Sequence, residues 1–242
     1  MGLVLYICWN NQNISELMNQ NSPIYFLKFG EEKYLKKLLI NGTIYCNSLD
    51  YFQNLEEQGL RGDNYEGTTR IYNYHEYKYF SVKIKDSRTG EQFPINPTKL
   101  HVREFFSEMK GNMYSLYCIR PKDIIDVEKF KIDSRVKDFG SHFLIINAQE
   151  FLKRFFKVLD KSNIEFTALN VNYYEKNRHN GNLTLFDKSN EFEYQNEFRF
   201  LIKRDNSNPI EFEIGNIEDI AKIFKSDLIN DLEISWEPKE DV

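Results

Sequence analysis

Residues 191–203 read EFEYQNEFRFLIK, and the second half of this stretch alternates between apolar and polar positions. A period of two is typical of a β-strand with one buried face. The residues predicted to face the core are Phe198, Phe200 and Ile202. The residues predicted to share the opposite face are Glu197, Arg199, Leu201 and Lys203. The preceding Tyr194-Gln195-Asn196 predicts a polar turn that leads into this strand.

Further strands are predicted on both sides of this segment. Aromatic and β-branched runs predict them at residues 3–9, 24–29, 43–47, 112–119, 142–146, 164–174 and 210–214. Alternation over residues 70–85 predicts two more, and turn residues at 86–90 lead into a third short one. Residues 210–214 are expected to pair with the strand at 198–203 through a turn at 206–209.

Helices are predicted where apolar residues recur three and four positions apart. This spacing occurs at residues 31–40, 99–109, 148–161 and 217–224, with a short helical turn at 14–19. Gly42 predicts a left-handed end for the first helix, and Asn147 can cap the third. Strands outnumber helices and the two do not alternate regularly. The sequence therefore predicts an α+β fold of mostly antiparallel, split sheets with flanking helices, in a single domain over residues 1–242.

The composition limits the class of protein and its partners. Of 242 residues, 41% are hydrophobic and 29% are charged, as in soluble globular proteins. A net charge of −5 argues against recruitment of a polyanion by overall charge, and leaves a local basic groove open. Three scattered cysteines favour a reducing cytoplasm over a disulfide framework. The apolar run at residues 3–9 is too short to span a bilayer, so we expect no membrane partner.

Several common catalytic motifs are absent from the sequence. There is no GxxxxGK[ST], GxGxxG, GxSxG or HExxH, so phosphate-cradling loops, hydrolase elbows and helical zinc sites lack support. We expect no metal site. Cys46 and Cys118 lie in apolar strands, where a thiol behaves as a small hydrophobe with a raised pKa.

The late strand carries the first candidate site. Glu197 stands at the strand mouth, two residues after Gln195. A carboxylate there can accept a hydrogen bond from a ribose hydroxyl and stabilise an oxocarbenium-like cation. Arg199, on the same face, can hold Glu197 ionised or bind a phosphate. An ordinary Glu–Arg ion pair on a half-exposed strand explains the same residues.

Two more candidate sites lie near the front of the chain. Lys28 supplies a point cation for a pyrophosphate, Ser48 a short donor and acceptor, and Tyr51 or Phe52 a ring for stacking. The glycine-punctuated loop at residues 61–67 carries Arg61 and two acids, and can close on a ligand or simply cap a hairpin. The alternative is that Tyr51 and Phe52 belong to the core and Lys28 is solvated.

The order of these sites resembles that of the ADP-ribosyltransferase superfamily. The matching residues are Lys28 in an early strand, Ser48 in a middle strand and the Gln195-x-Glu197 motif at a late strand start. The resemblance implies a split antiparallel sheet that binds NAD⁺ as co-substrate, with Lys28 and Arg61 near its phosphates. It implies that Glu197 stabilises the transition state and that Gln195 presents the acceptor. The chain departs from the family at Lys28, where Arg or His is usual, and at Asn47-Ser48, which replaces Ser-Thr-Ser.

A second resemblance covers most of the chain. The KF, G.IY.NSL.YF, RGD..EG, FG.HF and E.RF segments are similar to those of uncharacterised bacterial proteins that look like toxin or phage-defence components. It implies a cytoplasmic effector that modifies a macromolecular acceptor, protein or nucleic acid, with an antitoxin or defence-system partner. The alternative from another class is a non-catalytic sensor or binding module with a tight protein partner. A metal-dependent nuclease is a third alternative; it needs clustered acids and a lysine, and Glu211-Phe212-Glu213 is too weak a signal to support it.

Overall fold

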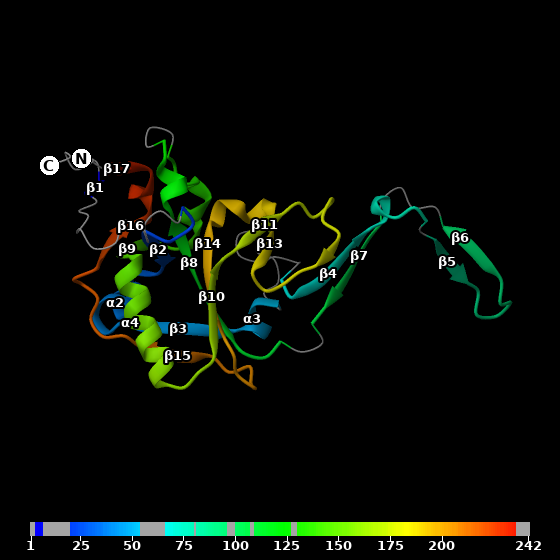
Figure 1. Cartoon of the computed structure of the whole chain (residues 1–242), viewed down its shortest axis with the longest axis horizontal. Coiled ribbons are helices and arrows are strands. Elements are labelled where there is room, and N and C mark those ends of the chain that lie inside the picture. Colours follow the sequence, from blue (N-terminus) through cyan, green and yellow to red (C-terminus); the bar gives the residue numbers. More distant parts are fainter. Residues whose placement is uncertain are drawn as a thin grey trace.

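The main body is built on one antiparallel sheet. The computed structural model describes residues 3–6, 20–53, 66–79, 81–95, 100–106, 109–126 and 130–235. Six strands of this sheet follow the order β10 (Phe166–Asn170), β14 (Glu197–Ile202), β8 (Asn112–Ile119), β2 (Tyr25–Gly30), β9 (His142–Asn147) and β16 (Ala221–Lys225). The sheet is completed by β3 (Thr43–Ser48), which pairs with β8, and by β15 (Ile210–Glu213), which pairs with β3. Figure 1 shows these strands in the body of the molecule.

Two helices pack on one face of the sheet. Helix α4 (Ala148–Lys161) begins where the Asn147 side chain accepts a hydrogen bond from the Glu150 N–H at 3.1 Å, as the sequence predicts. Helix α2 (Glu32–Asn41) ends at Gly42, whose φ of +66° is left-handed, also as predicted. A third, five-residue helix, α3 (Leu49–Gln53), follows β3.

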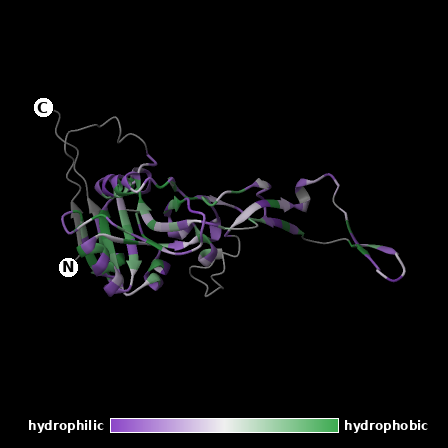
Figure 2. Cartoon of the chain, turned by 90° about the horizontal axis from the view of Figure 1, so that it is seen from below, coloured by the Kyte–Doolittle hydropathy of each residue, from purple (hydrophilic) through white to green (hydrophobic). Residues whose placement is uncertain are grey.

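The sheet separates two apolar cores. The core under the helices holds Phe198, Phe200 and Ile202, which confirms the predicted inward face of β14. Leu27 and Phe143 belong to the core on the opposite face. In Figure 2 the green, hydrophobic residues accordingly follow the strands of the body.

A β-ribbon leads away from the body. It begins as the sheet β12-β4-β7, formed by β4 (Thr68–Asn73), β7 (His101–Phe105) and the short β12 (Gly181–Asn182). Further out, β5 (Val82–Lys85) and β6 (Gln92–Ile95) form a two-stranded hairpin. Figure 1 shows this hairpin standing clear of the sheet. We call the described residues 68–79, 81–95 and 100–106 the arm.

Short elements complete the described chain. Two parallel pairs join β1 (Leu3–Tyr6) to β17 (Leu232–Ser235) and β11 (Asn172–Tyr174) to β13 (Asp187–Ser189). The 3₁₀ helices are η1 (Tyr74–Glu76), η2 (Pro121–Ile124), η3 (Ser134–Phe139), η4 (Asn190–Gln195) and η5 (Ser226–Asp231). No helix in the described part of the chain is long and apolar enough to cross a membrane.

The α+β class with mostly antiparallel sheets is confirmed, and three local predictions are wrong. The region predicted as a helix at 99–109 contains strand β7, and the one at 217–224 gives way to β16. In both places the helical spacing is overridden because a neighbouring strand, β4 or β9, offers a hydrogen-bonding edge. Strand β15 pairs with β3, not with β14. The turn predicted at 14–19 lies outside the described residues.

Candidate functional site

The sheet register places Lys28 and Glu197 on opposite faces of the sheet. Residues that pair directly in an antiparallel ladder project to the same face. Glu197 pairs with Tyr117, and Tyr117 pairs with Leu27, so these three share one face. Lys28, the next residue, projects to the helix-covered face, where its Nζ donates to the Ser115 carbonyl at 2.8 Å. Lys28 and Glu197 therefore do not face the same side of the sheet.

Glu197 lies in a buried cluster of charges. Its Oε1 accepts a hydrogen bond from Lys188 Nζ at 2.6 Å, and its Oε2 accepts one from Arg199 Nε at 2.9 Å. The side chains of Lys188, Glu197 and Arg199 are only 5%, 10% and 1% exposed. The predicted ion pair between Glu197 and Arg199 is present, and it is buried instead of half-exposed. We call Glu66, Lys188, Gln195, Glu197 and Arg199 the charge cluster.

Arg199 joins this cluster to the loop that precedes β4. Its two terminal nitrogens donate to the Glu66 carboxylate at 2.9 and 3.0 Å, a bidentate contact. Its Nη1 also donates to the Leu185 carbonyl at 2.6 Å. Four of the five guanidinium N–H groups are thus in use within the protein, which leaves little capacity for a phosphate.

The charges around Glu197 determine its protonation. Burial by itself would raise the pKa of the carboxyl, but Arg199 and Lys188 outweigh burial and hold the pKa of Glu197 well below its usual range. Glu197 is therefore an anion at neutral pH, as a stabiliser of a cation requires. Both of its oxygens already accept hydrogen bonds from protein cations.

A left-handed residue sets the orientation of Gln195 and Glu197. Asn196, between η4 and β14, has φ +40°, a conformation that asparagine tolerates better than most residues. Its side-chain amide donates to the Cys118 carbonyl at 2.7 Å and fixes the turn on β8. Gln195 Oε1 then accepts from Lys188 Nζ at 2.5 Å, so the two residues of the Gln-x-Glu motif share one ammonium group.

Ser48, the last residue of β3, and the aromatic residues of α3 make mainly local contacts. Ser48 is buried, and its Oγ accepts a hydrogen bond from the Tyr51 N–H at 3.1 Å at the start of α3. Tyr51 is 47% exposed, while Phe52 and Leu201 both pack against a small core of Leu49, Met109 and Met113. Because Leu201 and Arg199 project to the same face of β14, Phe52 lies on the side of the sheet that holds the charge cluster.

Sequence reasoning left part of the cluster unidentified. Lys188 was not predicted. The sequence offers one indirect sign of it: a buried Glu197 requires cationic partners, and Lys188 is nearby in the chain. Glu66 was noted only as one acid of the loop at 61–67. Arg61, predicted to lie near phosphates, falls outside the described residues.

Burial raises the pKa of Cys46 to about 12 and that of Cys118 to about 12, as expected for thiols in apolar strands. In the described ranges no three His, Cys, Asp or Glu side chains gather as metal ligands.

The arm carries an unusual concentration of exposed apolar groups. More than half of the large hydrophobic side chains exposed in the described part of the chain lie within residues 77–106. They are Tyr77, Tyr79, Ile84, Phe93, Ile95, Val102, Phe105 and Phe106. Exposed apolar groups gathered in this way commonly mark an interaction surface.

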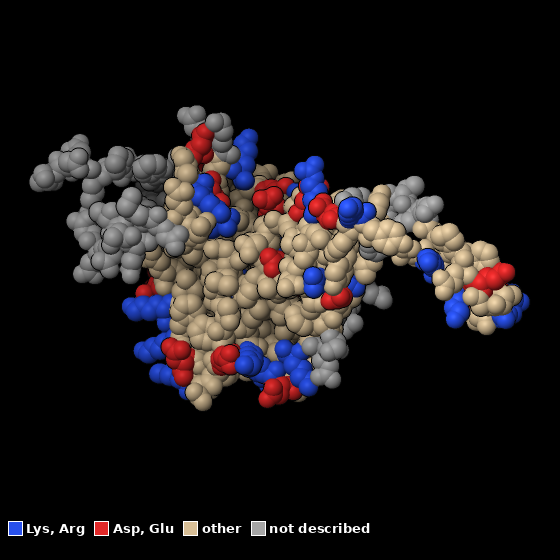
Figure 3. All heavy atoms as spheres, turned by 45° about the vertical axis from the view of Figure 1, so that its right-hand side comes forward, with Lys and Arg blue, Asp and Glu red and all other residues tan. Residues whose placement is uncertain are grey.

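The β5–β6 hairpin has one apolar face and one polar face. Val82 pairs with Ile95 and Ile84 with Phe93, so these four side chains form one apolar face, here called the hairpin face. Ile84 is 57% and Phe93 53% exposed. The opposite face is made of Lys83, Lys85, Gln92 and Pro94. Figure 3 shows basic and acidic groups at the tip of this projection.

Comparison of the chain with protein-family models, with curated proteins and with solved structures found no match in any of the three.

Proposed function

We propose that this chain is a non-catalytic binding module that docks a protein partner through the arm. The observation that carries the proposal is the hairpin face, four apolar side chains on a two-stranded hairpin with no layer behind them in the described structure. A lone hairpin is marginally stable in water, so covering this face stabilises both the hairpin and a complex.

The charge of the hairpin indicates the chemistry of the partner. Residues 78–95 carry four basic side chains, Lys78, Lys83, Lys85 and Arg88, against Asp86 and Glu91. The whole chain, by contrast, has a net charge of −5. The complementary partner is a protein with an apolar patch flanked by carboxylates. A nucleic acid would satisfy the lysines but would leave the hairpin face in water.

The charge cluster supports this function as an anchor for the arm. Arg199, on the central sheet, donates two hydrogen bonds to the carboxylate of Glu66. Glu66 lies two residues before β4 begins at Thr68. Further contacts fix the same strand, since the Leu183 N–H donates to the Thr69 carbonyl at 2.8 Å. An anchored base orients the arm and lowers the entropic cost of docking.

The test compares matched apolar-to-acid substitutions. The arm variant is Ile84→Asp with Phe93→Asp, at positions 57% and 53% exposed. The control variant is Tyr34→Asp with Ile40→Asp on α2, at positions 58% and 52% exposed. Each tagged full chain is expressed in its native cells, and co-purifying proteins are quantified.

We expect one protein to be reduced at least about tenfold by the arm variant and to be retained by the control. We expect it to elute earlier as salt is raised, because the partner contacts include ion pairs. Equal recovery of every co-purifying protein with both variants refutes the proposal.

The second candidate is the NAD⁺-dependent ADP-ribosyltransferase implied by the resemblance. One observation favours it: Gln195 and Glu197 lie side by side on a common ammonium group, with Phe52 on the same side of the sheet. For this function Lys188 or Arg199 must release Glu197 when a substrate binds.

This candidate is tested by release of nicotinamide from NAD⁺ in the presence of cell lysate. Turnover that falls at least about a hundredfold in Glu197→Gln protein that remains folded supports the transferase. Absence of turnover in the unmodified protein, with the arm-dependent partner retained, supports the binding module.

A further inference from the structure

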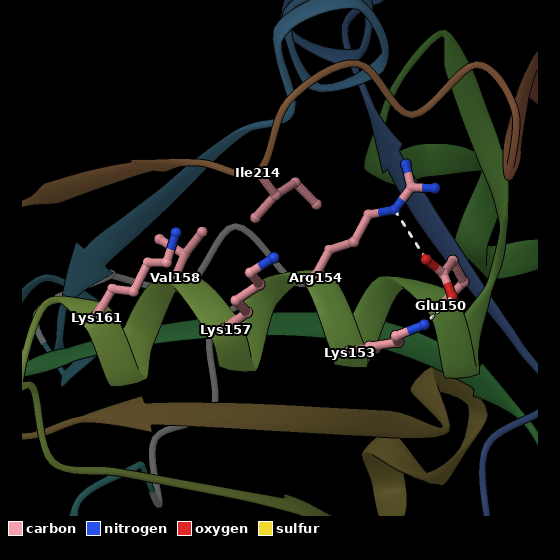
Figure 4. A pocket seen from close by; sticks show the side chains of 7 residues that line it. All are labelled: Glu150, Lys153, Arg154, Lys157, Val158, Lys161 and Ile214. Carbon is pink, nitrogen blue, oxygen red and sulfur yellow. Dashed lines mark hydrogen bonds and ion pairs between the residues drawn. The ribbon is translucent and has the colours of Figure 1, made fainter.

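A hollow lies between helix α4 and the segment that follows β15. Its volume is about 510 Å³, and its lining comprises Glu150, Lys153, Arg154, Lys157, Val158, Lys161 and Ile214. Figure 4 shows side chains from successive turns of α4, with Ile214 facing them from the neighbouring segment. Five of the seven lining residues are charged, so the hollow is suited to a charged ligand and not to an apolar one.

One end of this groove is fixed by paired charges. Arg154 donates to Glu150 at 3.2 Å, to Asp219 at 2.9 Å and to the Asn216 carbonyl at 3.1 Å. These bonds tie α4 to the 214–219 segment and hold the two walls of the groove together. Lys153 lies 3.6 Å from Glu150.

The other end carries uncompensated positive charge. Lys157 and Lys161 form no ion pair with any residue that the structure describes. They follow Lys153 at intervals of four residues, about 6 Å apart along the helix. Like charges at this spacing repel by a few tenths of a kcal/mol per pair. An anion in the groove would remove that repulsion.

We propose that this groove binds a small molecule that carries a chain of phosphates. Lys157 and Lys161 are point cations suited to successive phosphate groups. Val158 and Ile214 supply aliphatic surface between the two walls, where an uncharged portion of the ligand, such as a nucleoside, is accommodated. The site lies on α4 and does not depend on the function proposed for the arm.

Calorimetric titration of the full chain tests the proposal with tripolyphosphate, ATP and adenosine as probes. The groove variant is Lys157→Gln with Lys161→Gln, which keeps the helix propensity close to that of lysine. The control is Lys33→Gln with Lys37→Gln, two exposed lysines with the same spacing on α2.

We expect saturable 1:1 binding of tripolyphosphate, weakened at least about tenfold in the groove variant and unchanged in the control. Tighter binding of ATP than of tripolyphosphate places the nucleoside on the aliphatic surface, and equal binding assigns the affinity to the phosphate chain alone. No saturable binding of either phosphate probe, or equal weakening in both variants, overturns the proposal.

Discussion

Glu197 is a buried carboxylate, and each of its two oxygens accepts a hydrogen bond from a protein cation. It accepts hydrogen bonds from Lys188 and Arg199, and Arg199 carries the interaction on to Glu66. Removing one member of such a cluster leaves a buried charge without its partner. The expected consequence at the scale of a single residue is a loss of stability that depends on pH.

The first prediction concerns Glu197→Gln. At pH 7 the variant should lose about 3–5 kcal/mol of unfolding free energy, as measured by urea denaturation. The folded-state pKa of Glu197 is lowered, so the stability it contributes is present above the unfolded pKa of 4.5 and is lost as the pH falls below it. The difference between the two proteins should therefore shrink by about 2 kcal/mol between pH 7 and pH 3. A difference that stays constant over this range contradicts the assignment.

Residue-scale prediction from the sequence succeeded where the periodicity was local. Alternation placed Glu197 and Arg199 on one face, and the pair is formed. It could not reveal that Lys28 faces the other way, because that depends on the register between β2, β8 and β14, three strands distant in sequence. The contact between Lys188 and Glu197 could not be predicted either, because it depends on how η4 folds the chain between the two residues.

Among the elements, the end of helix α2 was predictable because glycine readily adopts the left-handed backbone conformation that ends a helix. Gly42 ends α2 at φ +66°, and a Cβ on it would lie 2.1 Å from the Gly215 carbonyl oxygen. The position is therefore restricted both by its backbone angle and by its neighbour. Gly90, in the β5–β6 turn, has a similar φ of +77° with nothing within 4 Å of a Cβ.

The second prediction uses this contrast. Gly42→Ala should lower the unfolding free energy of the protein by more than about 2 kcal/mol, since a strained φ and a steric clash add. Gly90→Ala shares the strained φ but lies in the hairpin outside the main cores, so the global transition should shift by less than about 1 kcal/mol. Thermal or urea denaturation of both variants measures the difference. Equal losses would show that the Gly215 contact is unimportant.

Strand edges limited prediction at this scale. The sequence around β7 and β16 has apolar residues at helical spacing, yet both segments are strands because β4 and β9 present free edges to them. Likewise β15 leaves the sequence-adjacent β14 and pairs with β3. A single sequence does not report which edge is available, since that is settled only when the sheet is assembled.

At the scale of the whole molecule, the charge cluster couples the central sheet to the base of the arm. The third prediction is that Glu66→Gln raises hydrogen-exchange rates in β4 and β7 at least about tenfold, with β2 and β9 unchanged. The matched control is Glu165→Gln, which removes an ion pair with Lys203 whose side chains are 72% and 71% exposed. Such a surface pair contributes little, so exchange should not change. Uniform acceleration throughout the sheet would assign Glu66 to global stability instead.

The proposed function requires the hairpin face to be a docking surface. The most direct measurement is photo-crosslinking in the native cells, with p-benzoylphenylalanine placed in turn at Ile84, Phe93 and, as a control, Tyr34. We predict that the first two positions yield an adduct with the same protein and that Tyr34, exposed to a similar degree on α2, yields none with it. If positions 84 and 93 give no adduct, or if all three give the same adduct in equal yield, the arm is not the binding surface.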